Sequence, residues 1–178
     1  VSAAVDRIAA DLGAPTVLVN NAGILRDNLL FKMTLDDWDS VMSVHLRGAF
    51  LMSRAVQGHM VAARWGRIVS LSSISALGNR GQVNYSAAKA GVIQASKYAA
   101  LAYATTGVRI NVIAPGFTGT RKMLAAIPDA ETLAERSALV PMNRPIDPSE
   151  TADACLWLCS DAASGVTGSV VAVDGGKA

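Results

Sequence analysis

The sequence alternates short runs rich in valine and isoleucine with longer helical stretches, and this alternation most constrains the fold. It is typical of β-α-β units that build a parallel sheet. Four strands are expected, at Thr16–Asn20, Arg67–Ser72, Arg109–Ala114 and Ser169–Val173. Their apolar residues run almost without interruption, which indicates strands that are covered on both faces. The sequence therefore predicts an α/β fold with a buried parallel sheet.

Helices are expected between these strands, at Asp36–Ala62, Tyr85–Thr105 and Ser149–Ser160, with a further helical stretch around Lys122–Ala138. Thr34 with Asp37 three residues later resembles a capping box, which begins a helix. Pro148 precedes the last helix, and Gly107 stands where a left-handed residue ends one. The stretch Pro141–Pro148 is predicted to be a loop that joins two helices, not a domain linker.

Composition limits the function classes. The chain has 178 residues, 51% of them hydrophobic, which suits one compact domain. Its 16 Lys plus Arg and 14 Asp plus Glu nearly balance, so no strong field favours nucleic acid or anionic lipid. No apolar stretch approaches the roughly 20 residues of a membrane span, and no signal peptide is evident. A soluble, cytoplasmic protein that acts on small molecules is expected.

Two cysteines, Cys155 and Cys159, lie four residues apart on a predicted helix. Metal or redox chemistry would usually bring CxxC pairs or nearby histidine ligands, and none are present. Free cysteine is commonly a small buried hydrophobe. Core packing is therefore expected for both, and no metal site.

The run Tyr85-Ser86-Ala87-Ala88-Lys89 places a phenol and an ammonium four residues apart on one helical face. Side chains so spaced lie about 5–6 Å apart at Cβ, close enough for the lysine charge to favour the phenolate. A tyrosine with a pKa of about 10 exchanges protons near neutrality only if its anion is stabilised. The pair predicts a proton donor or acceptor, although the same spacing also arises on ordinary amphipathic helices.

Polar or backbone-exposing residues follow three consecutive predicted strands: Asn20-Asn21-Ala22-Gly23, then Ser72-Ser73, then Pro115-Gly116. Parallel α/β sheets bind their ligands outside the carboxyl ends of the strands. Carbonyl reduction needs a proton donor and a second hydrogen-bond donor that holds the carbonyl oxygen, and serine suits the second task. The three strand ends therefore predict one reaction site.

Together these motifs resemble the short-chain dehydrogenase/reductase family, whose hallmarks are an NNAG run, a serine, a YxxxK pair and a PG turn. The resemblance covers essentially the whole chain and implies an enzyme, an NAD(P)(H)-dependent oxidoreductase on a Rossmann-like doubly wound parallel sheet. It implies that Tyr85 is the catalytic acid/base and that Ser73 polarises the substrate oxygen. Lys89 would lower the pKa of Tyr85 and bind the nicotinamide ribose.

The resemblance also implies a set of cofactor-binding residues for NADP(H) or NAD(H). They are Asn20, Ala22 and Gly23 on the adenosine side, and Pro115, Gly116, Thr118 and Thr120 near the nicotinamide, beside Tyr85 and Lys89. Each has a structural alternative. The glycines could serve only as turn residues, and the threonines only as caps of the next helix.

Two positions depart from the family pattern. The family serine usually lies thirteen residues before the tyrosine, the spacing of Ser72, whereas Ser73 lies twelve before it. Ser73 is preferred because the second serine at this strand end is the usual catalytic one, and Ser72 would point to the opposite side. His45 stands where the family's fourth catalytic residue is usually asparagine. A packed histidine without a catalytic role is the equal alternative.

The runs Gly23–Leu30 and Gly78–Tyr85 are similar to those of bacterial 3-oxoacyl-[acyl-carrier-protein] reductases, so a 3-oxoacyl thioester is the leading substrate. Arg64 matches one arginine that docks the acyl carrier protein there, but Thr106 lacks the second charge. Val44–Gly48 also resembles hydroxyacyl-CoA dehydrogenases, which keeps a CoA thioester or oxidation open.

The two long helices carry apolar residues on more faces than one sheet could cover, among them Phe50, Met52, Ile93 and Leu101. A homodimer or homotetramer is expected. The family packs two such helices per subunit at its dimer interface.

The segment Val1–Gly13 resembles the end of an amphipathic helix, and the first strand follows at once. A complete dinucleotide-binding fold has two βαβαβ halves, and a glycine-rich turn of the first half holds the pyrophosphate. One N-terminally incomplete domain over residues 1–178 is expected, with the first half missing. An active reductase would then be a piece of a longer polypeptide, whereas a chain that truly starts at Val1 would be a structural or binding subunit.

Overall fold

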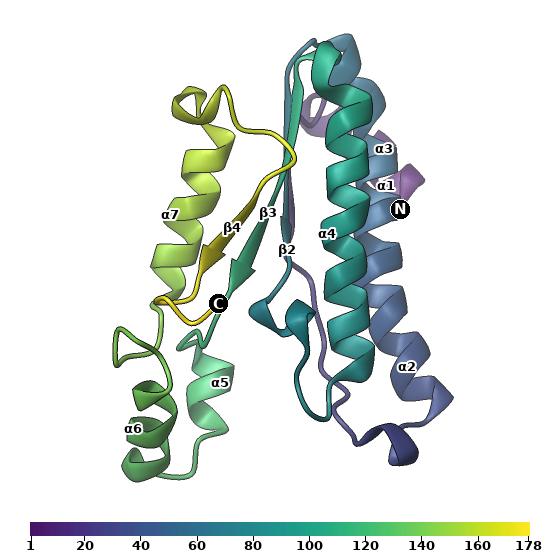
Figure 1. The fold of residues 1–178 in the computed structure, drawn as a ribbon. Coiled ribbons are helices and arrows are strands. Elements are labelled where there is room, and N and C mark those ends of the chain that lie inside the picture. The colour runs from purple at the N-terminus through teal and green to yellow at the C-terminus, as the bar shows by residue number, and fades with distance from the viewer.

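The computed structural model describes all residues 1–178 and contains a four-stranded parallel sheet between two layers of helices (Figure 1). The strands β1 (Val17–Asn20), β2 (Gly66–Leu71), β3 (Val108–Pro115) and β4 (Val170–Val173) pair in chain order. Each agrees with a predicted strand to within one residue at either end. The predicted α/β class is confirmed.

The helices divide between the two faces of the sheet and its carboxyl end (Figure 1). One face carries α1 (Ser2–Leu12), α2 (Leu35–Met42), α3 (Gly48–Ala62) and α4 (Val83–Tyr103), and α7 (Pro148–Cys159) covers the other. The short helices α5 (Arg121–Ala125) and α6 (Ala130–Ala138) lie beyond the carboxyl end of β3. None of the helices combines the length and the apolar character of a membrane-spanning segment.

The predicted helix signals are present. Thr34 and Asp37 form a capping box at the start of α2, and Asp147 with Glu150 forms another at the start of α7. Gly107 follows the 3₁₀ turn that extends α4, with φ 85° and ψ 1°, a left-handed conformation that glycine adopts without strain. These local signals set where the helices begin and end.

Alternate residues of the inner strands build two separate cores, because successive side chains of a strand point to opposite faces. Ile68 and Ile110 pack with Val56 and Met60 in the cluster under α1, α3 and α4. Val69, Leu71 and Ile113 pack with Leu158 under α7 in the second cluster. Both faces of β2 and β3 are thereby covered, as predicted.

The prediction of coverage on both faces is wrong for the two edge strands. Val17 and Val19 of β1 are 46% and 43% exposed, and Val170 of β4 is 37% exposed. The reason is that α7 packs on β2, β3 and β4, so the outward side chains of β1 meet no helix on that face. Only Leu18 of β1 is buried, on the α3 side.

Two predicted helices are interrupted. The stretch predicted as one helix over Asp36–Ala62 contains a π-helical turn at Ser43–Arg47 that separates α2 from α3. Such turns insert a residue into the helix and often lie at functional sites. The stretch predicted around Lys122–Ala138 is two helices, because Pro128 follows α5 and Asp129 caps α6.

Cys155 and Cys159 are half-buried and pack against the α7-side core, as predicted. Burial raises the pKa of Cys155 to about 11 and raises that of Cys159 as well. No group of three or more metal-ligating side chains occurs in the chain. The two thiols contribute to the packing under α7.

Candidate active site

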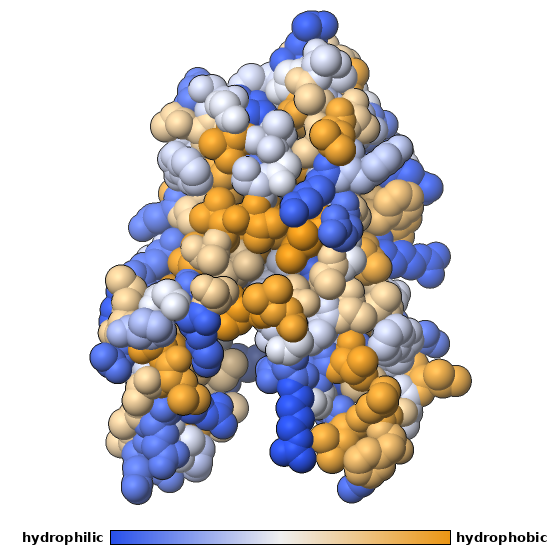
Figure 2. Space-filling model, in the orientation of Figure 1, coloured by the Kyte–Doolittle hydropathy of each residue, from blue (hydrophilic) through white to orange (hydrophobic).

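A cavity of about 530 Å³ lies at the carboxyl ends of β1, β2 and β3. Figure 2 shows the molecule notched between the part formed by α5 and α6 and the part formed by α2 and the start of α4. The lining comes from the segments that follow the three strands and from α4, α5 and α7: Asn21, Gly23, Ile24, Leu25, His45, Leu71, Ser72, Ser73, Tyr85, Lys89, Pro115, Gly116, Thr118, Thr120, Lys122, Met123, Ala126, Pro148 and Thr151. Two lysines line it, and no carboxylate does.

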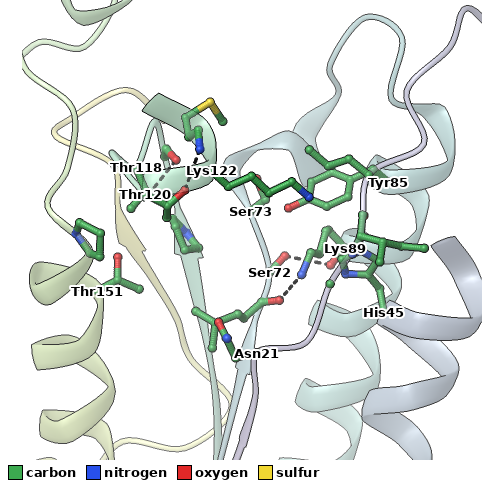
Figure 3. Close-up of a pocket in the computed structure, with 18 of the residues that line it drawn as sticks. Asn21, His45, Ser72, Ser73, Tyr85, Lys89, Thr118, Thr120, Lys122 and Thr151 are labelled. Carbon is green, nitrogen blue, oxygen red and sulfur yellow. Dashed lines mark hydrogen bonds between the residues drawn. The ribbon is translucent and has the colours of Figure 1, made fainter. Parts of the chain in front are cut away.

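The structure places Tyr85 and Lys89 on the same face of α4, toward this cavity (Figure 3). The Lys89 Nζ atom lies 5.5 Å from the centroid of the Tyr85 ring. It donates a hydrogen bond of 2.5 Å to the Leu71 carbonyl oxygen at the end of β2. Burial lowers the pKa of Lys89 to about 8, since the residue is only 5% exposed and no carboxylate pairs with its amine.

The expectation that Lys89 lowers the pKa of Tyr85 is not met in this arrangement. The pKa of Tyr85 is raised, chiefly because burial disfavours the phenolate. The nearby Ser73 side chain lowers this pKa in part, and the charge of Asp27 raises it further. The Tyr85 hydroxyl therefore remains protonated at neutral pH, as a proton donor must be.

The two serines after β2 have different surroundings. Ser72 is buried, and its hydroxyl donates to the carbonyl oxygen of Lys89 at 2.9 Å, which ties β2 to α4. Ser73 is half-buried, accepts a hydrogen bond from the Ser75 amide, and faces the same space as the Tyr85 hydroxyl (Figure 3). Of the two serines, Ser73 is therefore the one whose side chain faces the Tyr85 hydroxyl.

His45 lies in the π-helical turn and is buried. Its Nε2 atom is 3.0 Å from the Ile24 amide nitrogen and 2.8 Å from the Ile24 carbonyl oxygen, so either neutral tautomer makes one of these bonds. The ring meets Tyr85 edge to face at 5.2 Å between centroids. His45 therefore holds the segment after β1 against the tyrosine, and burial lowers its pKa.

Close packing explains two glycines at the site. A Cβ atom on Gly23 would lie 2.5 Å from Cε1 of His45, and one on Gly116 would lie 2.7 Å from Cβ of Asp174. Neither position leaves room for a side chain. Thr118 donates to the Gly116 carbonyl oxygen, and Thr120 accepts from the Met123 amide, so both threonines also stabilise the segment after β3.

Two of the predicted cofactor-binding residues, Asn20 and Ala22, do not line the cavity. The Asn20 amide donates to the hydroxyls of Ser53 and Ser70 and so fastens the end of β1 to α3 and β2. Its neighbour Asn21 lines the cavity instead. Alternation along a strand end indicates that only one of two adjacent asparagines can face a given side.

Comparison with known proteins agrees with the motifs. A family model described as enoyl-(acyl carrier protein) reductase matches residues 1–178. The chain is 43% identical over 175 residues to nodulation protein G of Azospirillum brasilense, covering 98% of this chain and 70% of that protein. It is 44% identical over 161 residues to 3-oxoacyl-[acyl-carrier-protein] reductase FabG of Aquifex aeolicus, covering 90% and 64%. This chain belongs to the short-chain dehydrogenase/reductase family.

The FabG reductase of Escherichia coli is a further relative, 41% identical over 177 residues, which are 99% of this chain and 72% of that protein. The chain thus spans between 64 and 72% of the length of these three relatives. Members of the short-chain dehydrogenase/reductase family are NAD(P)-dependent oxidoreductases. The predicted family and enzyme class are confirmed.

The lining of this dehydrogenase/reductase suits the nicotinamide end of such a cofactor. Ribose and carboxamide groups need hydrogen-bonding partners, and the lining includes the Lys89 amine and the residues Thr118 and Thr120. Gly116 lines the cavity, and its Cβ position faces Asp174, outside the lining. The absence of carboxylates in the lining fits a ligand with phosphate charges.

Proposed function

We propose that this short-chain dehydrogenase/reductase reduces 3-oxoacyl thioesters to 3-hydroxyacyl thioesters with NADP(H) or NAD(H). The supporting observation is the pair of hydroxyls, Ser73 and Tyr85, on one wall of the cavity with Lys89 beside them. The reductases of Aquifex aeolicus and Escherichia coli named for this substrate class are its relatives. The bound cofactor would supply the hydride.

In the proposed reaction, Ser73 donates a hydrogen bond to the substrate oxygen and Tyr85 donates the proton that this oxygen takes up. A raised pKa keeps the Tyr85 hydroxyl protonated before the reaction. As the proton leaves, the phenolate forms beside the amine of Lys89, whose positive charge stabilises it. His45 serves as a positioning residue because it holds Ile24 and the Tyr85 ring.

For the cofactor, we propose that Gly23, Pro115, Gly116, Thr118 and Thr120 contact it directly, since all five line the cavity. Asn20 and Ala22 would act indirectly, by fixing the conformation of the chain at the end of β1. Tyr85 and Lys89 would meet the nicotinamide ribose.

The function is tested on the complete gene product with acetoacetyl-CoA and either NADPH or NADH. Oxidation of the reduced cofactor that depends on the thioester is the expected result. With NAD⁺ or NADP⁺ as the hydride acceptor, a turnover number for 3-hydroxybutyryl-CoA oxidation that exceeds the one for acetoacetyl-CoA reduction would instead indicate a hydroxyacyl-CoA dehydrogenase. A protein that binds neither dinucleotide would contradict the proposal and leave only a structural or binding role.

The assignment of the serines predicts opposite effects of two alanine substitutions. Ser73→Ala is expected to lower kcat about 10- to 100-fold, because it removes one donor to the reacting oxygen, and to lower stability less than Ser72→Ala does, because its bond with the Ser75 amide is only partly buried. Ser72→Ala is expected to lower stability by about 1 kcal/mol, since it removes the buried bond to the Lys89 carbonyl oxygen. Steady-state kinetics and urea unfolding of both variants measure these effects. A larger kcat loss in Ser72→Ala would reverse the assignment.

The charge of the lining predicts how the thioester carrier is recognised. Lys122 of α5 extends from its helix across the cavity toward the wall with Ser73 and Tyr85 (Figure 3). We expect the Lys122 amine to attract the phosphate groups of the coenzyme A or acyl-carrier-protein arm that bears the thioester. Lys122→Met should raise KM for acetoacetyl-CoA about 2- to 5-fold, as for an exposed ion pair.

The matched control for this prediction is Arg121→Met, which removes a neighbouring exposed charge that does not line the cavity. The phosphate-free acetoacetyl N-acetylcysteamine thioester provides a second control, and its KM should not respond to Lys122→Met. Equal changes with both thioesters would show that the amine does not recognise phosphate.

We also propose that the protein is a homodimer or homotetramer. Phe50 of α3 is 55% exposed and Leu101 of α4 is 81% exposed. Met52 and Ile93, named with them from the sequence, are half-buried. A second subunit packed on α3 and α4 would cover the two exposed side chains.

A further inference from the structure

Asn84, the residue before Tyr85, is a polar side chain that is fully buried, with 0% of its surface exposed. Its Nδ2 atom donates to the carbonyl oxygen of Arg26 at 2.9 Å and to that of Asp37 at 3.2 Å. Its Oδ1 atom accepts from the Tyr85 amide at 2.7 Å. The side chain therefore joins the first turn of α4 to the segment after β1 and to α2.

These bonds supply partners that the backbone does not. The Arg26 carbonyl oxygen and the Tyr85 amide take part in no backbone hydrogen bond. Gln82, at the N-cap position of α4, makes no capping bond with its side chain. The first amides of a helix have no partner within it, and a buried polar group left unpaired lowers stability. An apolar side chain in place of Asn84 would leave both backbone groups unpaired.

The two ties to the segment after β1 meet at the tyrosine. His45 holds Ile24 and contacts the Tyr85 ring edge to face. Asn84 holds Arg26, two residues further along that segment, and the Tyr85 amide. Ring and backbone of the tyrosine are thus both held against one segment. A displacement of about 1 Å at a reacting group lowers the rate on the order of 10²-fold, so such ties affect turnover.

We propose that Asn84 is a positioning residue for Tyr85. Its side-chain amide holds the first turn of α4 against the segment after β1, so that the phenolic hydroxyl stays beside Ser73 (Figure 3). The inference rests on the proposed function, in which Tyr85 donates the proton to a thioester substrate. Asn84 does not line the cavity, so it acts only through the tyrosine.

The test is a double-mutant cycle on the complete gene product, with Asn84→Ala, Tyr85→Phe and the combined variant. Asn84→Ala alone is expected to lower kcat with acetoacetyl-CoA about 10- to 100-fold, with a much smaller change in the Kd of NADPH or NADH. In the Tyr85→Phe background the same substitution should lower kcat less than about 2-fold, because the hydroxyl that Asn84 positions is already gone. A residue that only supports the fold would lower kcat by the same factor in both backgrounds.

Asn111→Ala is the matched control. Asn111 of β3 is 1% exposed, donates to the Val166 carbonyl oxygen and accepts from the Ser169 amide, but it does not line the cavity. Its replacement should lower the Tm much as Asn84→Ala does and leave kcat unchanged. Asn84→Ser, whose hydroxyl ends one bond short of the amide nitrogen, takes the place of the alanine variant in the cycle if that variant does not fold.

Three results would overturn the inference and leave the proposed function intact. They are an unchanged kcat in Asn84→Ala, equal kcat losses in the wild-type and Tyr85→Phe backgrounds, and a kcat loss in Asn111→Ala as large as that in Asn84→Ala. A wild-type protein that oxidises neither NADPH nor NADH in the presence of acetoacetyl-CoA would instead contradict the proposed function, and this inference with it.

Discussion

Replacing Tyr85 with phenylalanine is expected to lower kcat with a 3-oxoacyl thioester about 10²- to 10⁴-fold, the usual contribution of a positioned proton donor. The ring keeps its edge-to-face contact with His45 in this variant, so the fold should be retained. Only the hydroxyl beside Ser73 is lost. Steady-state kinetics of the complete gene product measures the effect, with the dinucleotide Kd and thermal unfolding recorded in parallel.

Tyr98→Phe is the control for this substitution. Tyr98 lies on the same helix but is 75% exposed and does not line the cavity. The same loss of a phenolic hydroxyl should leave kcat unchanged there. A Tyr85→Phe variant that retains wild-type turnover would show that the YxxxK pair is an ordinary feature of α4, and the proposed mechanism would fail.

The architecture was predictable because it depends on patterns that lie along the chain. Continuous apolar runs located all four strands to within one residue, since a buried strand leaves a strong local pattern. The rule that ligands bind at the carboxyl ends of parallel strands then brought Gly23, Ser73 and Gly116 to one rim, which the structure bears out as one cavity.

Some of the remaining features had a local signal. Pro128 stands inside the stretch predicted as one helix over Lys122–Ala138, and a proline in that position ends a helix. Asp129 after it is a good cap for the next helix. Adjacent asparagines at a strand end likewise point to opposite sides, which accounts for Asn21 in the cavity and Asn20 outside it.

Other features depend on contacts between distant segments and leave no local pattern. The π-helical turn around His45 accompanies its bonds with Ile24, 21 residues earlier in the chain. The orientation of the Lys89 amine depends on the Leu71 carbonyl oxygen, 18 residues earlier. Burial of the phenol, and hence the raised pKa of Tyr85, follows from how α4 packs against these segments. Spacing on one helix could not predict this direction.

Lys89 yields the second large expected effect, a loss of activity coupled to a pH-dependent change in stability. Its pKa is about 8 in the folded state and 10.5 ordinarily, so between these values unfolding takes up a proton. Stability therefore rises as the pH increases from about 8 to 10.5, and below that range the buried charge costs about 3 kcal/mol. Lys89→Met removes this cost of burying the charge. It also leaves the Leu71 carbonyl oxygen without a partner, and this loss cancels about 1–3 kcal/mol of the gain in stability.

The most decisive prediction is therefore how the difference in stability between Lys89→Met and the wild type depends on pH. The stability of Lys89→Met relative to the wild type should fall by about 3 kcal/mol between pH 7 and pH 10.5, measured by urea unfolding, while turnover is lost because the phenolate has no neighbouring cation. Lys97→Met, an exposed lysine on the same helix, should leave both the pH profile and turnover unchanged. A constant difference between Lys89→Met and the wild type across this range would mean that the amine is solvated in solution. It would then not be held in the buried position from which its charge supports Tyr85.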